Sequence, residues 1–398
     1  MRALLTLDFR KLWLSSAVAN LGDGVTVAAG PLLVASLTTN PAAVAGAVFA
    51  QQLPWLLFAL ISGAWADRLD RRRLVVAVNI VRGSALTLLS AAVLSGWASV
   101  PLIYAVFFVL GTGETLADSA SAAFVPALVA PELRPRANSL MYANFTVLNQ
   151  FAAKPFGAWL FVVAAAVPFG LNAVTFGLSA ALVAGIRAVP AGSPRRRLRA
   201  DIAEGVRWLA RHRLLRTLAL TMAVGNVVFS AAFAIFVLYA HARLGLSDVG
   251  YGFLLTAFAA GGLLGTVVAP RLIRRFGSSP LLRAGLLIEV ALHATLALTR
   301  DPWVAAAMIV VFGAHATVWG VIVTTIRQRD VPPEMYGRIA AVYALLELGG
   351  AALGSLLGGA VAAAYGLVAT YATAAVAMAL IAVVAWRPIR SAADRPIT

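Results

Sequence analysis

Residues 42–66 read AAVAGAVFAQQLPWLLFALISGAWA, residues 67–73 read DRLDRRR, and residues 74–97 read LVVAVNIVRGSALTLLSAAVLSGW. Each of the two apolar runs is long enough to cross about 30 Å of hydrocarbon as a helix, which rises about 1.5 Å per residue. The segment between them is almost entirely charged, so it belongs in water at one surface of a bilayer. These residues therefore predict two membrane-spanning helices joined by a tight polar turn.

The same alternation of apolar runs and polar turns continues along the whole chain. Of the 398 residues, 61% are hydrophobic and 12% are charged, whereas soluble domains contain about 45–50% apolar and about 25% charged residues. Backbone in lipid must form its hydrogen bonds within its own segment, and the runs lack the alternating pattern of barrel strands, so helices are expected. The sequence predicts an all-α membrane protein with twelve transmembrane helices, at residues 11–37, 42–66, 74–97, 101–126, 138–166, 168–189, 217–241, 250–270, 280–299, 302–326, 338–364 and 367–387.

The basic residues fall on one side of this predicted bundle. The expected loops on that side hold nearly all of the Lys and Arg, and the expected loops on the other side hold only Arg243 and Arg300. Because short cytoplasmic loops carry an excess of Lys and Arg, we expect both termini in the cytoplasm and a multi-pass location in the cell membrane of a bacterium. This placement explains the net charge of +16 without a nucleic acid. The expected partners are the lipid bilayer and a small-molecule substrate.

Several kinds of chemistry are excluded by the residues that the sequence lacks. The chain has no cysteine, which excludes disulfides and thiolate metal sites, and its histidines form no H-E-x-x-H pattern. Neither Lys11 nor Lys154 follows a glycine, so there is no Walker A loop and no ATPase domain is expected. We therefore expect neither an enzyme nor a metal site nor a cofactor.

A constant shift along the sequence superposes the first half on the second. It aligns residues at corresponding loops and helix ends, namely Gly63 with Gly265, Arg72 with Arg274, Glu132 with Glu334, Arg136 with Arg338 and Gly157 with Gly359. Many transporters are built from such duplicated halves. The predicted organisation is a six-helix bundle at residues 1–189, a basic cytoplasmic linker at 190–216, and a second six-helix bundle at 217–398.

The linker is expected to contain an amphipathic helix at residues 201–218. Apolar side chains recur on one side of such a helix while arginines stay on the other, and the apolar set is Ile202, Val206, Leu209 and Leu214. A helix of this kind lies on anionic headgroups. A site for a regulatory partner is the alternative.

The charged turn carries a family resemblance. Residues 63–73, GAWADRLDRRR, resemble the signature loop of the major facilitator superfamily, G-x-x-x-D-R/K-x-G-R/K-R/K, with Asp70 where the family usually has glycine. The resemblance covers the whole chain, because twelve helices, a six-plus-six repeat and a basic middle loop are all typical of that superfamily. Finer similarity is to the branch of macrolide and enterobactin exporters, in FRKLW at 9–13, NLGD at 20–23 and RQRDVP at 327–332. The antiporter signature of the fifth helix is present only as KPFG at 154–157.

The resemblance implies that the signature loop latches the two halves in the outward-facing state and releases in the inward-facing state. The residues of this latch are Gly63, Asp67, Arg68, Arg71 and Arg72. On physical grounds alone, Asp67 can accept hydrogen bonds from nearby amides or from the positive end of a helix dipole, and Arg72 can bridge to a carboxylate. The alternative is that the arginines only follow the positive-inside rule, and this interpretation is favoured for Arg68.

Charged residues inside the predicted helices are the candidate coupling site, because each costs about 2.5–3.5 kcal/mol to insert. Asp23 lies near the middle of the first predicted helix, and Glu114 and Asp118 lie one turn apart on the fourth. These three carboxylates are the proton-binding candidates, with Asp118 alternatively a structural partner of Arg72. The basic residues expected to neutralise them are Arg82 and Lys154.

The second half carries fewer intramembrane charges. Glu289 and His293 are spaced one turn apart, which predicts either a proton relay or a mutually satisfied polar pair. His315 falls opposite Gly113 under the shift, beside Glu114, and is a cavity candidate. The residues expected to line a substrate cavity are Phe145, Phe233, His315, Tyr343 and Glu347.

Together these observations predict a monomeric secondary transporter that works by alternating access. We expect proton-coupled export of a small hydrophobic or amphipathic compound, such as a drug, a macrolide or a siderophore-like molecule, driven by the proton gradient. Three alternatives use the same observations: a facilitator or symporter for a small metabolite, a permease subunit of an ATP-driven system, and a membrane sensor or assembly protein that transports nothing.

Overall fold

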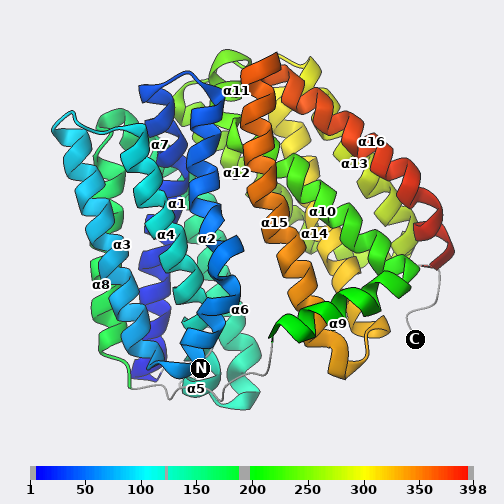
Figure 1. Ribbon diagram of the computed structural model, residues 1–398, viewed down its shortest axis with the longest axis horizontal. Helices are drawn as coiled ribbons and strands as arrows, with labels where there is room; N and C mark the ends of the chain where they lie inside the picture. Colours follow the sequence, from blue (N-terminus) through cyan, green and yellow to red (C-terminus); the bar gives the residue numbers. More distant parts are fainter. Residues whose placement is uncertain (1–5, 122–123, 188–197, 393–398) are drawn as a thin grey trace. The chain divides into compact units, whose positions relative to one another are not determined.

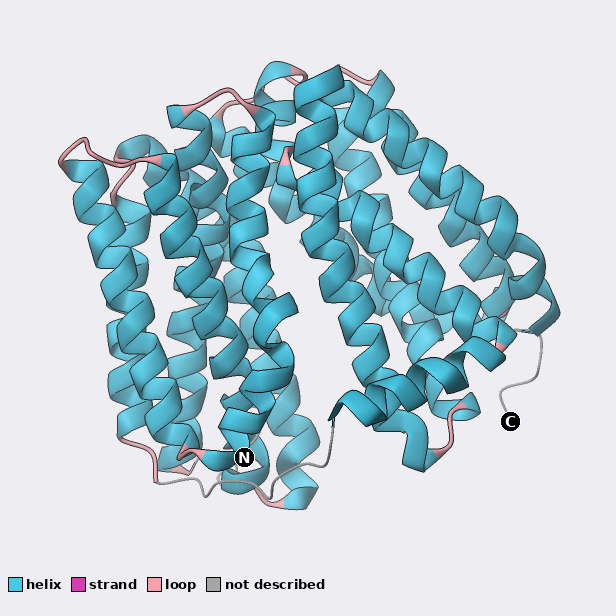
Figure 2. Cartoon of the chain, viewed as in Figure 1, coloured by secondary structure: helices cyan, strands magenta, loops and turns pink. Residues whose placement is uncertain are grey.

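The computed structural model describes residues 6–121, 124–187 and 198–392, and every regular element in that part of the chain is a helix (Figure 2). The helices of the first half are α1 (Leu7–Leu37), α2 (Pro41–Arg68), α3 (Arg71–Leu94), α4 (Val100–Ser121), α5 (Phe124–Leu128), η2 (Pro131–Leu133), α6 (Arg134–Asn144), η3 (Phe145–Ala152), α7 (Ala153–Val163) and α8 (Val167–Ala184). Those that follow are α9 (Leu198–Arg211), α10 (Arg213–Ala234), α11 (Phe236–Ala242), α12 (Asp248–Phe276), α13 (Ser278–Leu298), α14 (Pro302–Asp330), α15 (Pro333–Tyr365) and α16 (Leu367–Ala392).

Eleven helices in the described part of the chain are long and apolar enough to cross a membrane. The predicted span that is not among them is 138–166, where α6, the π-helix η3 and α7 follow one another without a break. α6 is polar, and the π-helix widens the turn over Phe145–Ala152, so neither α6 nor α7 reaches the length of a span. A π-helix of this length is rare, and such segments often occur at functional sites.

The chain forms two compact units. The first unit contains residues 1–39, 47–196 and 247–256, and the second unit contains residues 40–46, 197–246 and 257–398. Helices that correspond under the sequence shift contact one another in the same pairs: α1 with α7 and α8, and α3 with α4 and α8, in the first unit; α10 with α15 and α16, and α13 with α14 and α16, in the second (Figure 1). The units differ from the two halves of the sequence in two places. Residues 40–46, at the beginning of α2, belong to the second unit, and residues 247–256, at the beginning of α12, belong to the first unit.

Polar side chains join the helices of the first unit. Ser15 Oγ on α1 lies 2.7 Å from Ser179 Oγ on α8, and Asn79 Nδ2 on α3 donates to the same Ser179 hydroxyl at 3.0 Å. Asn172 Nδ2 on α8 donates to Thr26 Oγ1 on α1 at 2.7 Å. Lipid offers no alternative partner for these groups, so each bond stabilises the contact between α1, α3 and α8.

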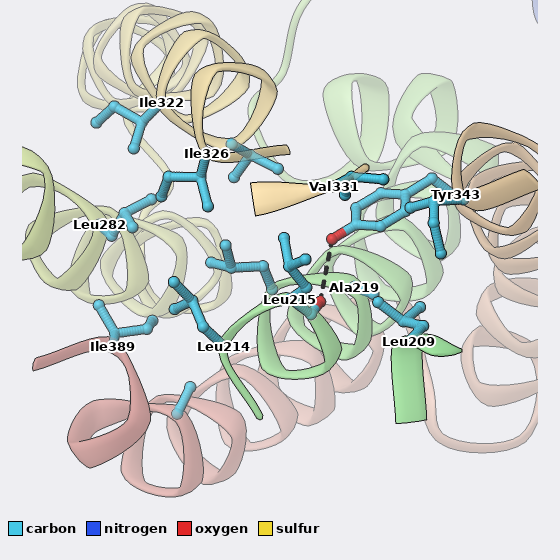
Figure 3. Packing of buried hydrophobic residues seen from close by; sticks show 14 of the residues in the cluster. Leu209, Leu214, Leu215, Ala219, Leu282, Ile322, Ile326, Val331, Tyr343 and Ile389 are labelled. Atoms are coloured by element: carbon cyan, nitrogen blue, oxygen red, sulfur yellow. Dashed lines mark hydrogen bonds between the residues drawn. The ribbon is translucent and has the colours of Figure 1, made fainter. Parts of the chain in front are cut away.

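An aliphatic core packs the second unit (Figure 3). Leu215 of α10 lies among isoleucines of α14 and α16, including Ile322, Ile326 and Ile389. Tyr343 is expected in a cavity from its sequence position, but its ring is buried in this core and its hydroxyl donates to the Leu215 carbonyl at 3.0 Å. The side chain therefore ties α15 to α10.

The predicted amphipathic helix is broken at His212. α9 ends at Arg211 and α10 begins at Arg213, and the His212 ring stacks on Trp208 with 3.6 Å between centroids. Leu209 is buried as expected, whereas Val206 is 47% exposed. The Glu204 carboxylate accepts a hydrogen bond from Arg338 Nη1 at 2.9 Å, which fixes α9 to α15. Residues 188–197, which include most of the basic start of the predicted linker, lie outside the described part.

A glycine seam lets α15 approach α10 closely. A Cβ atom added at Gly354 would lie 2.2 Å from the Val227 carbonyl oxygen, and one added at Gly358 would lie 2.2 Å from the Ala231 carbonyl oxygen. The obstacle is backbone in both places, so the two helices must separate to accommodate any side chain.

We predict that Gly354→Ala destabilises the protein by about 1–3 kcal/mol, the cost of overpacking. The measurement is unfolding of the detergent-solubilised protein by sodium dodecyl sulfate. Gly177→Ala on α8 is the matched control, because a Cβ there meets no atom within 4 Å. Equal stability of the two variants would contradict the described packing of α15 on α10.

Candidate functional site

An ion pair with a buried arginine lies within the first unit. Arg82 Nη2 on α3 donates to Asp23 Oδ1 on α1 at 3.0 Å, and the Arg82 side chain is 6% exposed. The guanidinium also lies over the Phe176 ring of α8, 4.0 Å from the centroid. Carboxylate and ring therefore hold one cation among three apolar helices. The sequence prediction that Arg82 neutralises an intramembrane carboxylate matches this contact.

Gly113 makes room for the arginine. A Cβ atom at this position of α4 would lie 2.6 Å from both Cγ and Cδ of Arg82. These atoms belong to the stem of the side chain rather than its flexible end, so they could not move aside without moving the guanidinium. Gly22 acts similarly on α1, where a Cβ atom would lie 2.0 Å from Asn172 Oδ1. Gly113 thus leaves the space that Arg82 occupies, and Gly22 leaves the space that Asn172 occupies.

The other two predicted carboxylates lie close to this pair. Glu114, directly after Gly113, is half-buried and Asp118 is exposed, and both interact electrostatically with Arg82 and Asp23. The side chain of Trp55 on α2 forms a hydrogen bond with Glu114. The structure therefore brings together Asp23, Arg82, Glu114 and Asp118, which we call the charge cluster. It contains three carboxylates and one guanidinium.

Lys154 has a different environment from the one predicted. It is buried at the start of α7, and its ammonium donates to Gln150 Oε1 one turn earlier, in the π-helix. The partner is a neutral amide rather than a carboxylate. The lysine thus links the π-helix to α7.

The predicted latch is only partly described. Gly63, Asp67 and Arg68 belong to the last turns of α2, and the side chains of Asp67 and Arg68 lie outside the described part. Arg72 Nη1 donates to the Ile186 carbonyl at 3.1 Å, just past the end of α8. Arg71 is the first residue of α3.

Asp70 has a structural reason to replace the usual glycine. It is the N-cap of α3, and its carboxylate accepts a hydrogen bond from the Arg73 amide at 3.1 Å. An N-cap carboxylate satisfies a free amide of the first turn and interacts favourably with the helix dipole.

A cavity of about 410 Å³ lies within the second unit. Residues of six helices line it: Thr221, Met222, Gly225, Asn226 and Phe229 of α10, Phe258 of α12, Leu286 and Glu289 of α13, Phe312, His315, Ala316, Trp319 and Gly320 of α14, Glu347 of α15 and Met378 of α16. We call this cavity the aromatic pocket. Its volume lies in the range of drug-sized ligand sites.

Three phenylalanines form one wall of the aromatic pocket. The Phe229 ring lies 5.8 Å from Phe258 and 5.7 Å from Phe312, and the latter two rings are 5.6 Å apart. Trp319 meets the edge of His315 at 5.8 Å. Such ring faces give a binding site that is apolar but attractive to positive charge.

The polar residues of the aromatic pocket include a histidine beside a carboxylate. His315 Nε2 lies 3.7 Å from Glu289 Oε1, with the two side chains 5% and 16% exposed. Glu289 Oε2 is buried and has no hydrogen-bond partner among the described residues. The predicted pairing with His293 is different in the structure: His293 Nδ1 lies 2.9 Å from the backbone carbonyl of Glu289. The spacing along one helix therefore missed His315, whose ring lies beside the Glu289 carboxylate.

The predicted cavity residues divide between the pocket and other places. His315 and Glu347 line the aromatic pocket. Phe233 stacks on Phe229 at 5.9 Å but is outside the lining, Tyr343 is in the core, and Phe145 is exposed at the start of the π-helix. Sequence reasoning missed Phe312 and the pairing of Glu289 with His315, since both depend on which face of α14 turns inward.

Comparison with known proteins gives a consistent match over the full length. The profile of the transmembrane secretion effector family matches residues 3–394. The multidrug efflux pump Tap of Mycolicibacterium fortuitum is 28% identical over 394 residues, which cover 93% of each chain. The protein of the same name from Mycobacterium bovis is 27% identical over 404 residues, which cover 94% of this chain and 91% of the pump.

Solved transporter structures share the fold. The nucleoside transporter NupG superposes with a TM-score of 0.77 at 10% identity, over 97% of this chain and 100% of that one. A bacterial homologue of the iron transporter ferroportin, in its inward-facing state, gives a TM-score of 0.77 at 18% identity, over 97% and 99% of the two chains. At these identities the likeness concerns the fold alone.

We predict strong energetic coupling between Asp23 and Arg82. Arg82→Met alone is expected to destabilise the protein by about 2 kcal/mol, because it leaves the Asp23 carboxylate, which is 29% exposed, among apolar helices without its charged hydrogen-bond partner. Adding Asp23→Asn should recover at least about 1 kcal/mol of that loss. Unfolding of the four proteins of this double-mutant cycle in sodium dodecyl sulfate measures the coupling.

The pair of Asp8 and Arg187, 3.6 Å apart with the arginine 92% exposed, provides the control cycle. Its coupling should be close to zero, since water screens the exposed Arg187 guanidinium. Equal coupling in the two cycles would contradict the pairing of Asp23 with a buried arginine.

Proposed function

The chain belongs to the transmembrane secretion effector family of the major facilitator superfamily, and we propose that it exports a small apolar or amphipathic compound from the cell in exchange for protons. It is a membrane transporter and not an enzyme. The observation that carries the proposal is the aromatic pocket, a drug-sized cavity with aromatic walls among apolar helices. The relatives named multidrug efflux pumps support export of drug-like compounds.

The charge cluster is the proposed coupling site. One guanidinium neutralises one of its three carboxylates, so Asp23, Glu114 and Asp118 together have more acidic groups than Arg82 can pair. Arg82 Nε has no hydrogen-bond partner among the described residues, which leaves the guanidinium able to engage a second carboxylate. We propose that protons bind and leave the carboxylates that Arg82 does not neutralise, and that each exchange favours one state of the transport cycle.

We propose the full superfamily topology for this chain. In it the run from α6 to α7 supplies a twelfth crossing, residues 1–189 and 217–398 form six-helix bundles, and both termini are cytoplasmic. Alternating access by the two bundles, with the Gly63–Arg72 loop as a latch, would move the substrate across the membrane. The protein would act as a monomer without an ATPase.

Export should depend on the proton gradient and on the charge cluster. Cells that express the protein are expected to resist some members of a panel of toxic compounds and dyes, and an uncoupler should abolish this resistance. In inverted membrane vesicles, Asp23→Asn with Glu114→Gln should reduce proton-driven uptake at least about tenfold, the factor that corresponds to 1.4 kcal/mol.

Asp8→Asn is the matched control, because this carboxylate pairs with the exposed Arg187 outside the charge cluster. It should leave uptake unchanged. Substrate-dependent loss of protons from acidified vesicles indicates an antiporter, whereas co-uptake of protons would indicate a symporter. Full proton-driven uptake by the double variant would exclude the charge cluster as the coupling site.

The topology can be tested by cysteine labelling, because the chain has no cysteine of its own. Single cysteines at Ser193 and Ser247 should react with an impermeant maleimide from opposite faces of the membrane, Ser193→Cys from the cytoplasm and Ser247→Cys from outside. Labelling of both from one face would refute the proposed arrangement of crossings.

A further inference from the structure

The charged groups of the aromatic pocket are unbalanced. Glu289 and Glu347 both line it, and in the part of the chain that the structure describes no lysine or arginine does. The nearest basic group is the His315 imidazole, 3.7 Å from Glu289 Oε1. The second carboxylate oxygen of Glu289 is buried without a hydrogen-bond partner among the described residues. Buried carboxylate oxygens in proteins normally contact a cation or a hydrogen-bond donor, and Glu289 Oε2 contacts neither among the described residues.

In the first unit, a cation occupies the region that corresponds to the aromatic pocket of the second unit. The sequence shift aligns Asp23 with Gly225, Glu114 with Ala316 and Phe176 with Met378, and all three partners in the second half line the aromatic pocket. In the first unit this region is occupied by the Arg82 guanidinium, held by a carboxylate and the face of a ring. The counterpart of Arg82 is Ala284, so the second unit has no cation at that position. The glutamates and rings of its pocket come from positions other than the aligned ones.

Glycine and alanine at these positions also create the space. Where Asp23 and Glu114 fill the first unit, Gly225 and Ala316 leave the cavity of about 410 Å³. Gly285 of α13 leaves room for the His315 ring, since a Cβ atom there would be 2.2 Å from His315 Cε1. His315 Nε2 lies 3.7 Å from Glu289 Oε1, whereas Glu289 Oε2 has no hydrogen-bond partner among the described residues.

We infer that the aromatic pocket binds a lipophilic organic cation, with the Glu289 carboxylate as the counter-ion and the rings of Phe229, Phe258, Phe312 and Trp319 around the apolar part. This assignment rests on the proposed export function and narrows its substrate class. A positively charged amine or phosphonium group would complete the pairing of Glu289 and interact with the ring faces. An anionic compound, such as a siderophore-like carboxylate or catecholate, would be repelled by both glutamates.

Two ions of nearly the same size and shape and of opposite charge test this inference. Tetraphenylphosphonium and tetraphenylborate are titrated separately, by calorimetry, into the full-length protein in lipid nanodiscs, with empty nanodiscs subtracted. Tetraphenylphosphonium is expected to bind saturably and tetraphenylborate is not. Saturable binding of both ions with similar affinity, or of the borate alone, would overturn the inference.

Glu289→Gln identifies the binding group. This isosteric change should weaken tetraphenylphosphonium binding at least about tenfold, the factor that corresponds to 1.4 kcal/mol, whereas Glu289→Asp retains the charge and should bind more tightly than the glutamine variant. Glu204→Gln is the matched control, because this carboxylate lies on α9 and pairs with Arg338. Wild-type affinity in Glu289→Gln would overturn the inference. If that variant does not fold, the comparison of the two ions on the wild-type protein still decides.

Binding in nanodiscs requires no transport, so the two proposals can fail separately. Export of neutral dyes by a protein that does not bind tetraphenylphosphonium would overturn the inference and leave the proposed function standing. Glu289-dependent binding without any proton-driven flux in vesicles would overturn the proposed function and support the assignment of the pocket.

Discussion

The cost of placing charge among apolar helices is the constraint on which the rest of the structure depends. Each ionised side chain within the predicted spans must find a partner, and the ion pair of Asp23 and Arg82 is the direct solution. It requires α1, α3, α4 and α8 to converge, which explains why glycines stand at Gly22 and Gly113, where the side chains need space. The hydrogen bonds between α1, α3 and α8 surround the same region. In the first unit, the contacts between helices that pair the charges are therefore the same contacts that pack the helices.

The two units carry different side chains at the positions that correspond to this ion pair. The first unit fills the position with Asp23, Glu114 and an arginine, whereas the second unit carries Gly225 and Ala316 there and has a cavity instead. Coupling and substrate binding have opposite requirements, because a proton site needs closely packed charges and a substrate site needs volume. A duplicated fold can meet both requirements by changing a few side chains while the contacts between corresponding helices stay the same.

Much of this organisation could be predicted from the sequence, and the exceptions have physical reasons. The length of the apolar runs predicts nearly all of the helices, and the cost of intramembrane charge identifies Asp23, Glu114 and Arg82 as a group. The π-helix at Phe145–Ala152 could not be predicted, because its composition is that of an ordinary apolar helix. The pairing of Glu289 with His315 was missed because helical spacing detects partners on the same helix, and this partner lies on another.

A glycine opposite a polar side chain recurs where α3 meets α4 and where α13 meets α14. In the first unit Arg82 of α3 lies against Gly113 of α4; in the second, His315 of α14 lies against Gly285 of α13. The shift aligns Gly113 with His315 and Gly83 with Gly285, so the polar side chain comes from opposite helices in the two units. What the two halves share at this contact is therefore the combination of one small and one polar residue. For that reason the role of a residue in one half cannot be assigned to the aligned residue in the other half. The role of the pair, in which a glycine makes room for a polar side chain, can be assigned to both halves.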